Sequence, residues 1–438
     1  MKLATKILSS LTSLAMVAGL GYLATIPSQQ LLANAPSAIS VSTTALPLEI
    51  YCPGPVAELG GEDGTELGSL ALVGKATVVS HIGTSVLSSI IPDQLESGTP
   101  IVLETPDQTT NALSAIQTQV LKRSRMQGVA AGYCGQPTPI GYFVSGMGSL
   151  GRESILHLAN PGENEVQISL RVYTLGGGAQ KLVTLASFEQ VQVSMAALAT
   201  NEPSYAVSFE SNGAGISAFL QNRTSSGLAA TGVELVEASQ PATDQFIAGL
   251  TIFADQFEQP ILKVFNPSDQ ELAARVILHG VGVDSDVFEI NLPPRVLTEK
   301  ALNLSLGEYL VEVSSKEPVV SGVWTSKLGK ILDFAWLTPA STFEDSATLP
   351  VPELQTELVI ANPADAPISV SVLNAGQYQS LTIAAKSSSR ISVQVPEVQV
   401  QSPQQFMLSM QIVGDAGYAA INPTENRNLG SDVEVFVR

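Results

Sequence analysis

Cysteine, histidine, aromatic side chains and charge are all scarce in this chain of 438 residues. It has two cysteines and three histidines, 14% of its residues are charged and 5% are aromatic. Two cysteines are too few for a structural zinc site, and Cys52 and Cys134 are not spaced as a CxxC motif. With so few aromatic residues, a carbohydrate-binding surface built from exposed rings is not the first expectation.

Among the charged residues, the basic ones are the scarcer kind. The chain has 21 basic and 40 acidic residues, which gives a net charge of −19. Such a chain is repelled by nucleic acid and by anionic lipid headgroups. We therefore expect no nucleic-acid partner, and membrane contact only through the N-terminal segment. Despite 26 prolines and 35 glycines, the low charge and high Ala, Val and Leu content indicate a globular β-rich protein rather than a disordered one.

The N-terminus has the features of an export segment. Lys2 and Lys6 precede an apolar run at 7–26, and the next basic residue is Lys75. This charge distribution places the N-terminus in the cytoplasm and the bulk of the chain outside. Residues 1–27 are therefore read as a signal peptide or a signal anchor, and residues 28–47 as a linker. The predicted location is extracellular or in the cell envelope, with the N-terminal segment cleaved or retained in the plasma membrane.

An Asn-Pro unit recurs three times, at intervals of about 100 residues. In each copy apolar residues alternate up to the asparagine, and the following proline ends the strand because it has no N–H to donate. The asparagine side chain can bond nearby backbone and begin the turn. A second period-two strand then follows in register. The units are Asn160-Pro161, Asn266-Pro267 and Asn362-Pro363.

The repeat predicts an all-β chain of tandem immunoglobulin-like β-sandwich domains, three clear and one degenerate. Each copy holds about seven short strands separated by glycine or polar turns, as sandwiches do. The degenerate first domain is assigned because Gly-Val-Ala-Ala-Gly at 128–132 resembles Gly-Leu-Ala-Ala-Thr-Gly at 227–232, and this likeness favours a strand over a helix at 112–121. A propeller is disfavoured because its blades run nearer about 45 residues. We expect a rod of four domains at 48–141, 142–242, 243–344 and 345–438.

Several motifs carry candidate chemistry, and each has a simpler structural explanation. Gly146 to Gly151 match G-x-G-x-x-G, but a dinucleotide site needs a helix next and this segment continues as a strand. The acidic group Asp284, Asp286 and Glu289 could bind Ca²⁺, or could simply be a hairpin loop. Adjacent carboxylates such as Glu62-Asp63 carry little information in so acidic a chain.

The histidines and the basic cluster are treated in the same way. His81, His157 and His279 form no shared ligand set and lie beside no G-x-S-x-G elbow, so we expect them to be solvated or in turns. The basic stretch 122–125 could bind a phosphate or a uronate, although a charged loop between strands is the commoner case. We predict no catalytic, cofactor-binding or metal-binding residues and no cofactor.

The two cysteines are expected to form a disulfide. Both lie on the exported side of the chain, and no third cysteine competes. Cys52 precedes Pro-Gly-Pro, and Cys134 precedes Gly135 with Pro137 close behind, so both stand at strand ends. A bridge there would stabilise the first domain, whose pattern is the weakest.

With these motifs in view, the chain resembles an uncharacterised family of secreted or membrane-anchored actinobacterial envelope proteins. The resemblance rests on Cys-Pro-Gly-Pro at 52–55, on Gly-Val-Ala-Ala-Gly-x-Cys-Gly-x-Pro at 128–137, and on Phe-Val-Ser-Gly at 143–146 followed by Leu-x-Leu-x-Asn-Pro. A tryptophan usual in the family near Tyr142 is missing here. The resemblance implies an exported envelope protein with no known activity and no known site.

Together these observations predict a non-catalytic envelope protein with a structural or interaction role. Its partner would be an envelope protein or a polysaccharide. The alternative is a glycan-binding module or an accessory of a carbohydrate-active enzyme at the cell surface. Trp324 and Trp336 are expected to belong to the core of their own domain rather than to an exposed binding face.

Overall fold

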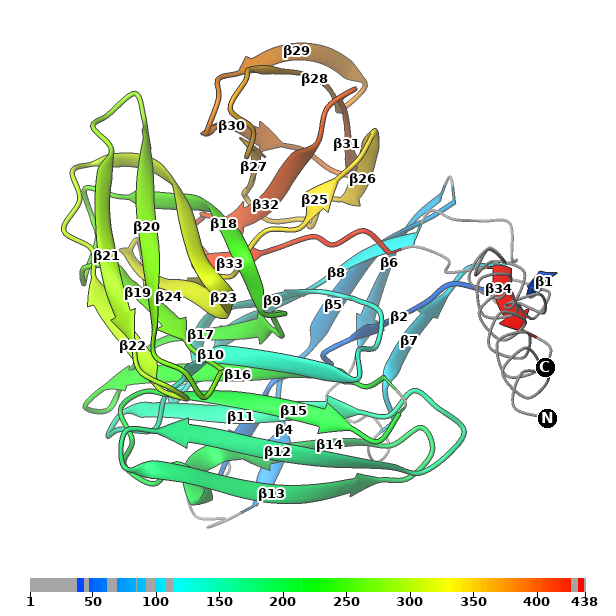
Figure 1. Ribbon diagram of the computed structural model, residues 1–438, viewed down its shortest axis with the longest axis vertical. Helices are drawn as coiled ribbons and strands as arrows, with labels where there is room; N and C mark the ends of the chain where they lie inside the picture. Colours follow the sequence, from blue (N-terminus) through cyan, green and yellow to red (C-terminus); the bar gives the residue numbers. More distant parts are fainter. Residues whose placement is uncertain are drawn as a thin grey trace, which may run out of the picture. The chain divides into compact units, whose positions relative to one another are not determined.

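The computed structural model describes residues 38–42, 47–60, 69–83, 85–91, 99–106, 113–213, 215–426 and 432–436 (Figure 1). The chain divides into two compact units. The larger is Pro47–Arg427, and the smaller combines Met1–Leu46 with Asn428–Arg438. In the smaller unit, strands β1 (Ala38–Ser42) and β34 (Asp432–Phe436) pair antiparallel. Part of the predicted linker is therefore a strand, and the last strand of the chain pairs with it instead of with the fourth sandwich.

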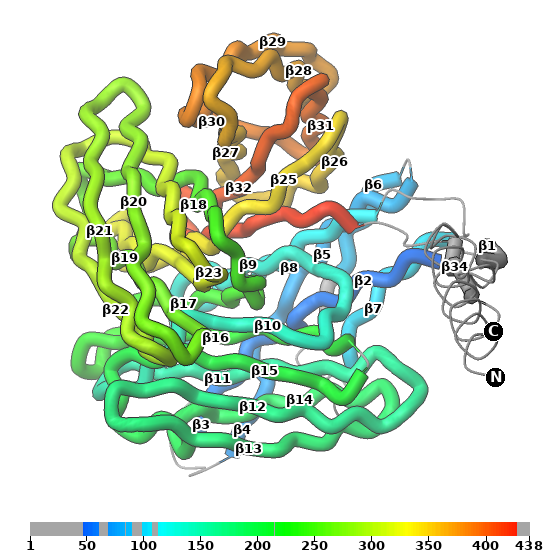
Figure 2. Tube along the Cα trace, viewed as in Figure 1, coloured from blue at the N-terminus to red at the C-terminus, as the bar shows by residue number. Residues whose placement is uncertain are grey.

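The larger unit is all-β apart from one 3-10 turn among its described residues, and its sheets fall into four modules (Figure 2). Module 1 contains the four-stranded sheet β6-β5-β8-β9 and the pairs β2-β7 and β3-β4. Its strands are β2 Glu49–Cys52, β3 Ala57–Leu59, β4 Leu70–Leu72, β5 Ala76–Ile82, β6 Ser85–Ile91, β7 Ile101–Glu104, β8 Leu113–Lys122 and β9 Gln127–Tyr133.

Module 2 is a sandwich of two four-stranded sheets, β10-β15-β12-β13 and β14-β11-β16-β17. Its core lies between them and includes Leu156, Leu170 and Phe209. The strands are β10 Ile140–Gly146, β11 Arg152–Ala159, β12 Val166–Thr174, β13 Gly177–Leu185, β14 Gln190–Ser194, β15 Tyr205–Ser211, β16 Ser217–Ser226 and β17 Ala229–Glu237, with the 3-10 turn at Met195–Ala197.

Modules 3 and 4 repeat this plan. In module 3 one long strand, β23, pairs with strands of both layers. Module 3 contains β18 Ala242–Ile252, β19 Ile261–Phe265, β20 Leu272–Val281, β21 Asp286–Leu292, β22 Leu297–Ala301, β23 Gly307–Leu328 and β24 Leu332–Leu337. Module 4 contains β25 Thr342–Phe343, β26 Ser346–Pro350, β27 Thr356–Asn362, β28 Ile368–Asn374, β29 Gln377–Ile383, β30 Ser387–Val393, β31 Glu397–Gln401, β32 Phe406–Ile412 and β33 Ala419–Ile421.

The tandem β-sandwich fold predicted from the repeat is confirmed. Strand β12 shows why the pattern was readable: Val166, Ile168, Leu170 and Val172 are buried, and the residues between them are exposed or half-buried. The segment at 113–122 is a strand, as its likeness to the later copies predicted. The sheets change at residues 140, 242 and 342, about two residues before each expected boundary.

The three repeated asparagines make the same set of hydrogen bonds. Each is fully buried. Asn362 Nδ2 donates to the carbonyl oxygens of Ala366 (2.8 Å) and Ile383 (3.2 Å), and its Oδ1 accepts the N–H of Ala364 (2.9 Å). Asn160 and Asn266 bond the matching backbone groups of their own modules. The side chain thus closes the turn that follows and joins it to a distant strand end.

Removing one of these side chains should destabilise its module. We expect Asn362→Ala to lower the free energy of unfolding by about 2–4 kcal/mol, because buried carbonyl and N–H groups lose their partners. The control is Asn374→Ala, which removes two solvent-exposed hydrogen bonds, to Ser392 and Gln394 of the same module, and should cost less than about 1 kcal/mol. Urea denaturation measures both, and equal losses would contradict a special role for the repeated asparagine.

The four modules form a closed ring and not the expected rod. Module 1 contacts module 2, module 2 contacts module 3 and module 3 contacts module 4. Module 4 then returns to module 1: Ile116, Val129 and Tyr133 of module 1 belong to the same apolar cluster as the core of module 4. Strands β9, β17, β24 and β33, which end the four modules, meet at the centre (Figure 1).

Buried or half-buried polar contacts join the modules at all four boundaries. Between modules 1 and 2, the Gln221 side chain bonds both the N–H and the C=O of Ala57, each at 2.7 Å. Between modules 2 and 3, Lys263 Nζ donates to Ser204 Oγ at 2.6 Å. The others are Arg390 with Glu308 (2.6 Å) between modules 3 and 4, and His81 with Glu397 (2.7 Å) between modules 4 and 1.

The two tryptophans lie at one of these boundaries. Trp324 and Trp336 cluster with Met147 and Val236 of module 2, and they are 6% and 2% exposed. The expectation that they fill the core of their own domain was therefore wrong. They are buried because module 2 packs against module 3, which the strand pattern of module 3 alone does not reveal.

Candidate functional site

The centre of the ring is organised around the carboxyl group of Asp333, which is 1% exposed. Its two oxygens accept four backbone N–H groups, one from each module. Oδ2 accepts from Val129 and Tyr418, both at 3.0 Å, while Oδ1 accepts from Phe334 at 3.0 Å and Val233 at 3.3 Å. We call Asp333 and these four N–H groups the hub.

Three glycines make room for the hub. Gly128, Gly232 and Gly417 directly precede the donor residues of modules 1, 2 and 4, and Asp333 holds the same place in module 3. All three have positive φ, and a Cβ at any of them would collide with the Asp333 side chain. The Asp333 side chain therefore occupies the space that the missing side chains of the three glycines leave.

A second acid, Glu234, lies beside the hub and is completely buried. Burial, and next the Asp333 charge, raise the pKa of Glu234 well above its ordinary value. Burial also raises the pKa of Asp333 well above its ordinary value, against the lowering effect of the four N–H donors. Because those donors surround both oxygens of Asp333, a proton placed there would face another donor. We therefore place the proton on Glu234.

The four modules meet again at a cavity of 460 Å³. The residues concerned lie five positions beyond Gly128, Gly232, Asp333 and Gly417. The corresponding residues there are Tyr133, Glu237, Thr338 and Asn422, and all four line the cavity. Glu237 Oε1 accepts the N–H of Tyr133 at 2.6 Å, and the carboxyl also accepts the N–H of Asn422. Asn422 Nδ2 donates to the carbonyl oxygen of Thr338 (2.9 Å) and to its Oγ1 (2.6 Å).

The cavity combines an acid of unusual pKa with an amide oxygen that lacks a partner. Burial raises the pKa of Glu237 to about 8, against the two N–H donors that lower it. Asn422 is 5% exposed, and its Oδ1 has no hydrogen-bond partner among the described residues. Residues between modules 3 and 4, including Pro339 and Ala340, form part of the cavity wall.

The raised pKa of Glu237 has a consequence for stability. The folded protein holds a proton on Glu237 that the unfolded chain releases near its ordinary pKa of 4.5. This contribution is fully present below about pH 4.5 and is lost as the pH rises through about 8. We expect the free energy of unfolding to fall across this window, and Glu237→Gln to make the fall shallower.

Burial raises the pKa of Glu234 as well. The free energy of unfolding of Glu237→Gln should therefore still fall as the pH rises, but less steeply. Urea denaturation at pH 5, 7 and 9 measures the effect. Glu163→Gln, at an exposed turn residue, serves as control. Parallel curves for the unaltered chain and Glu237→Gln would contradict the prediction.

The three histidines considered in the sequence analysis all make contacts within the fold. His81 and His157 are 5% and 1% exposed, so the expectation of solvated histidines was wrong for both. His157 lies 3.0 Å from Gln221 Oε1, and burial lowers its pKa to about 4. His279 pairs with Glu312 at 2.7 Å. Two of the three histidines thus lie at or near boundaries between modules, where no periodic pattern marks them.

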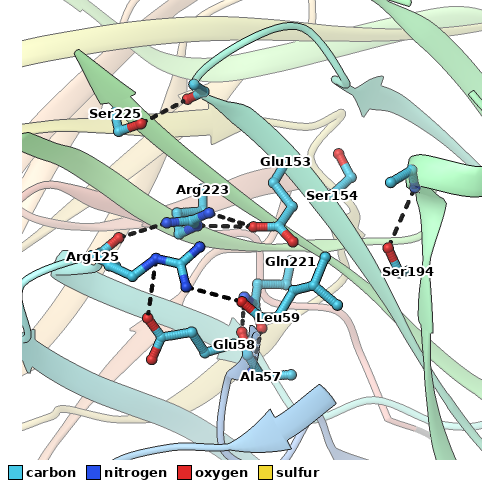
Figure 3. A network of polar contacts seen from close by, with 12 residues as sticks. Ala57, Glu58, Leu59, Arg125, Glu153, Ser154, Ser194, Gln221, Arg223 and Ser225 are labelled. Carbon is cyan, nitrogen blue, oxygen red and sulfur yellow. Dashed lines mark hydrogen bonds and ion pairs between the residues drawn. The ribbon is translucent and has the colours of Figure 1, made fainter. Parts of the chain in front are cut away.

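The basic stretch at 122–125 also belongs to a boundary. Arg123 and Arg125 face Glu58, whose side chain is fully buried, at 3.1 and 3.9 Å, and Arg125 donates to the Leu59 carbonyl oxygen. Arg223 of module 2 donates to Glu153 and to the carbonyl oxygen of Arg125 at 2.8 Å (Figure 3). Arg123 and Arg125 thus pair within module 1, and Arg223 joins this cluster to module 2, which accounts for the cluster without a phosphate or a uronate.

The remaining motifs lie in turns. Gly146 ends β10, and β11 follows Gly151 as a strand, so the segment lacks the helix that a dinucleotide site needs. The 284–289 acidic stretch belongs to the hairpin between β20 and β21. Among the described residues, no group of three or more His, Cys, Asp or Glu side chains could hold a metal ion. Glu62 and Asp63 lie outside the described residues.

A disulfide joins Cys52 and Cys134, across a sequence separation of 82. Both residues lie in the core of module 1. No helix in the described ranges is long and apolar enough to cross a membrane, and the predicted export segment at 1–27 falls outside those ranges.

Fold and site together define an all-β ring of four sandwich modules with an acidic centre. The chain belongs to a family of unknown function, DUF5719, which matches residues 91–396. Comparison with curated proteins gives no match.

Solved structures give distant likenesses only. A Ca²⁺-stabilised adhesin of an Antarctic bacterium that binds ice is 9% identical, with 81% of this chain and 93% of that one covered and a TM-score of 0.11. A tetra-tandem repeat from the extending region of a large adhesion protein is 8% identical, with 79% and 90% covered and a TM-score of 0.12. With scores this low, no property of these adhesins is transferred to this chain.

Proposed function

We propose that this protein is an exported, non-catalytic component of the cell envelope whose closed ring acts as a rigid scaffold for interaction. The observation that carries the proposal is the hub, where one carboxyl group holds N–H groups of all four modules. A ring closed in this way holds its outer loops at fixed distances from one another. Binding surfaces are commonly built on loops held by such scaffolds.

The use of the ionisable groups favours scaffolding over catalysis. Asp333 and Glu237 accept backbone N–H groups from other modules, and the histidines pair with glutamate or glutamine. A general base or an activated nucleophile needs a group free to take up a proton from a substrate. The disulfide and the predicted export segment support a location outside the cytoplasm.

The proposal is tested on the full chain isolated from cells that export it. Fractionation combined with thiol labelling under non-reducing conditions should place the chain outside the cytoplasm with Cys52 and Cys134 unlabelled. Pull-down from envelope extracts and a glycan array should then identify a protein or polysaccharide partner. Polysaccharide turnover abolished by a single carboxylate substitution, such as Glu237→Gln, would overturn the non-catalytic assignment.

A further inference from the structure

We propose that two copies of this chain associate through strand β29, antiparallel and edge to edge, about a two-fold axis at Ser380. This inference goes beyond the scaffold role, because it names a partner and the surface that binds it. It rests on an open strand edge in module 4, on the lack of charge along that edge, and on an order of residues that can pair with itself.

Strand β29 forms the outer edge of module 4 (Figure 1). It is the last strand of the sheet β26-β31-β28-β29 and pairs with β28 alone among the described strands. The pairing with β28 runs through all seven residues of β29 without a register shift. Five of these seven residues are exposed. A straight and exposed edge of this kind is a template for a further strand.

The backbone groups along this edge follow from the hairpin that β29 forms with β28. The hairpin loop has two residues, both with positive φ, so Asn374 and Gln377 on either side of it form a hydrogen-bonded pair. Bonded and non-bonded pairs alternate along an antiparallel ladder. The N–H and C=O groups of Tyr378, Ser380 and Thr382 therefore point away from β28, toward the open side.

The edge lacks the usual protection. Edge strands are commonly guarded by charged residues, by proline or by a bulge. Strand β29 has no charged residue, no proline and no register shift. The equivalent strands of modules 2 and 3 are charged, because β13 carries Lys181 and β21 carries Asp286 and Glu289. Glu289 holds the place in β21 that Ser380 holds in β29, three residues before the end of the strand.

The order of residues in β29 fits a second copy of the same strand. If Ser380 lies opposite Ser380 of the second copy, Tyr378 lies opposite Thr382 of that copy, so outward-pointing groups meet outward-pointing groups. No like charges face each other, and an aromatic residue opposite a β-branched one is a favourable cross-strand pair. The pairing would cover Tyr378, which is 76% exposed. The edge has no charge with which to select a charged partner, so an uncharged strand such as β29 itself is the matching occupant.

The test is sedimentation velocity on the full chain. We expect a monomer–dimer equilibrium with a Kd of about 10 μM, and tighter association as salt screens the net charge of −19 on each copy. Ser380→Lys and Ser380→Glu each place two like charges at the axis, so each should weaken the dimer at least about tenfold. An equimolar mixture of the two variants should dimerise again, because the charges at the axis are then opposite. Leu182→Lys, at the matching place in β13, is the control and should dimerise normally.

A cysteine at the axis gives a second measurement that adds no charge. Cβ atoms of directly opposite residues lie about 4.5–5.5 Å apart, so Ser380→Cys should form a disulfide between two copies in oxidising solution. Cys52 and Cys134 are bonded to each other and do not compete. Ser369→Cys lies on the neighbouring strand β28, opposite Thr382 of its own copy, and should give no such product.

Three results would overturn the proposal. They are a monomer at about 100 μM protein, a dimer that Ser380→Lys leaves unchanged, and a mixture of the two charged variants that stays monomeric. If the chain were monomeric and Ser380→Lys instead lost an envelope protein, the edge would belong to that protein, and a second copy would be the wrong occupant. None of these outcomes alters the scaffold assignment, which the hub carries separately.

Discussion

Replacing Asp333 by asparagine is expected to lower the free energy of unfolding by about 3–5 kcal/mol, although the two side chains have nearly the same size. The carboxyl group offers two oxygen acceptors to four backbone N–H groups. An asparagine amide keeps one of these oxygen atoms and replaces the other with an NH₂ group. Two N–H donors would then face another donor in a site that excludes water, and each unpaired buried donor costs about 1–3 kcal/mol.

Glu234→Gln is the matched control. It replaces a second buried acid that lies beside the hub and, by our assignment, already carries a proton. A neutral amide in its place should therefore change the free energy of unfolding by less than about 1 kcal/mol. Denaturation is followed by the fluorescence of Trp324 and Trp336, which lie at the boundary between modules 2 and 3. If Asp333→Asn matched the unaltered chain, the hub would contribute nothing to closing the ring. A large loss in Glu234→Gln would reverse the assignment of the proton.

The features that sequence alone predicted are those determined by short-range rules. Strand alternation placed β12, likeness to the later copies placed β8, and the Asn-Pro units marked turns in which Asn160, Asn266 and Asn362 bond groups close to them in the chain. In these cases the pattern and its partner lie within one module. The periodicity of that module is therefore sufficient evidence.

The ring was missed because its contacts join residues far apart in sequence. Gln221 and Ala57 are 164 positions apart, and His81 and Glu397 are 316 apart. A polar residue in a strand reads as a solvent-facing position, yet Gln221 is 1% exposed because module 1 covers it. Nothing in the alternation of a single strand distinguishes a face covered by water from a face covered by another module.

The hub did leave a signal in the sequence. Gly128, Gly232 and Gly417 each precede a hydrophobic residue in, or directly before, the last strand of a module, and Asp333 stands alone at the equivalent place. The likeness of 128–132 to 227–232 pairs Gly128 with Gly227, five positions before its structural counterpart Gly232. Correct alignment of the four copies would have isolated Asp333 as the exception, although its four partners require the folded ring.

Gly128→Ala is the complementary test, because it alters the space around the carboxyl group and leaves the group itself unchanged. A Cβ at Gly128 would lie 2.5 Å from Asp333 Oδ2 and 2.7 Å from its Cγ, well inside contact distance. Module 1 must then move away from module 3, or the hydrogen bond from Val129 to Asp333 must break. We expect a loss of about 3–5 kcal/mol in the free energy of unfolding, measured by urea denaturation, and faster limited proteolysis between modules.

The control separates this collision from the strain of an alanine at positive φ. Gly213 also has positive φ, at 94°, but a Cβ there meets nothing within 4 Å, so Gly213→Ala should cost only about 1–2 kcal/mol. A double-mutant cycle then locates the cause. In the Asp333→Ala background the carboxyl group is gone, so Gly128→Ala should cost about as little as Gly213→Ala. If Gly128→Ala cost the same in both backgrounds, the effect would come from the backbone alone, and Gly128 would not be leaving room for the hub.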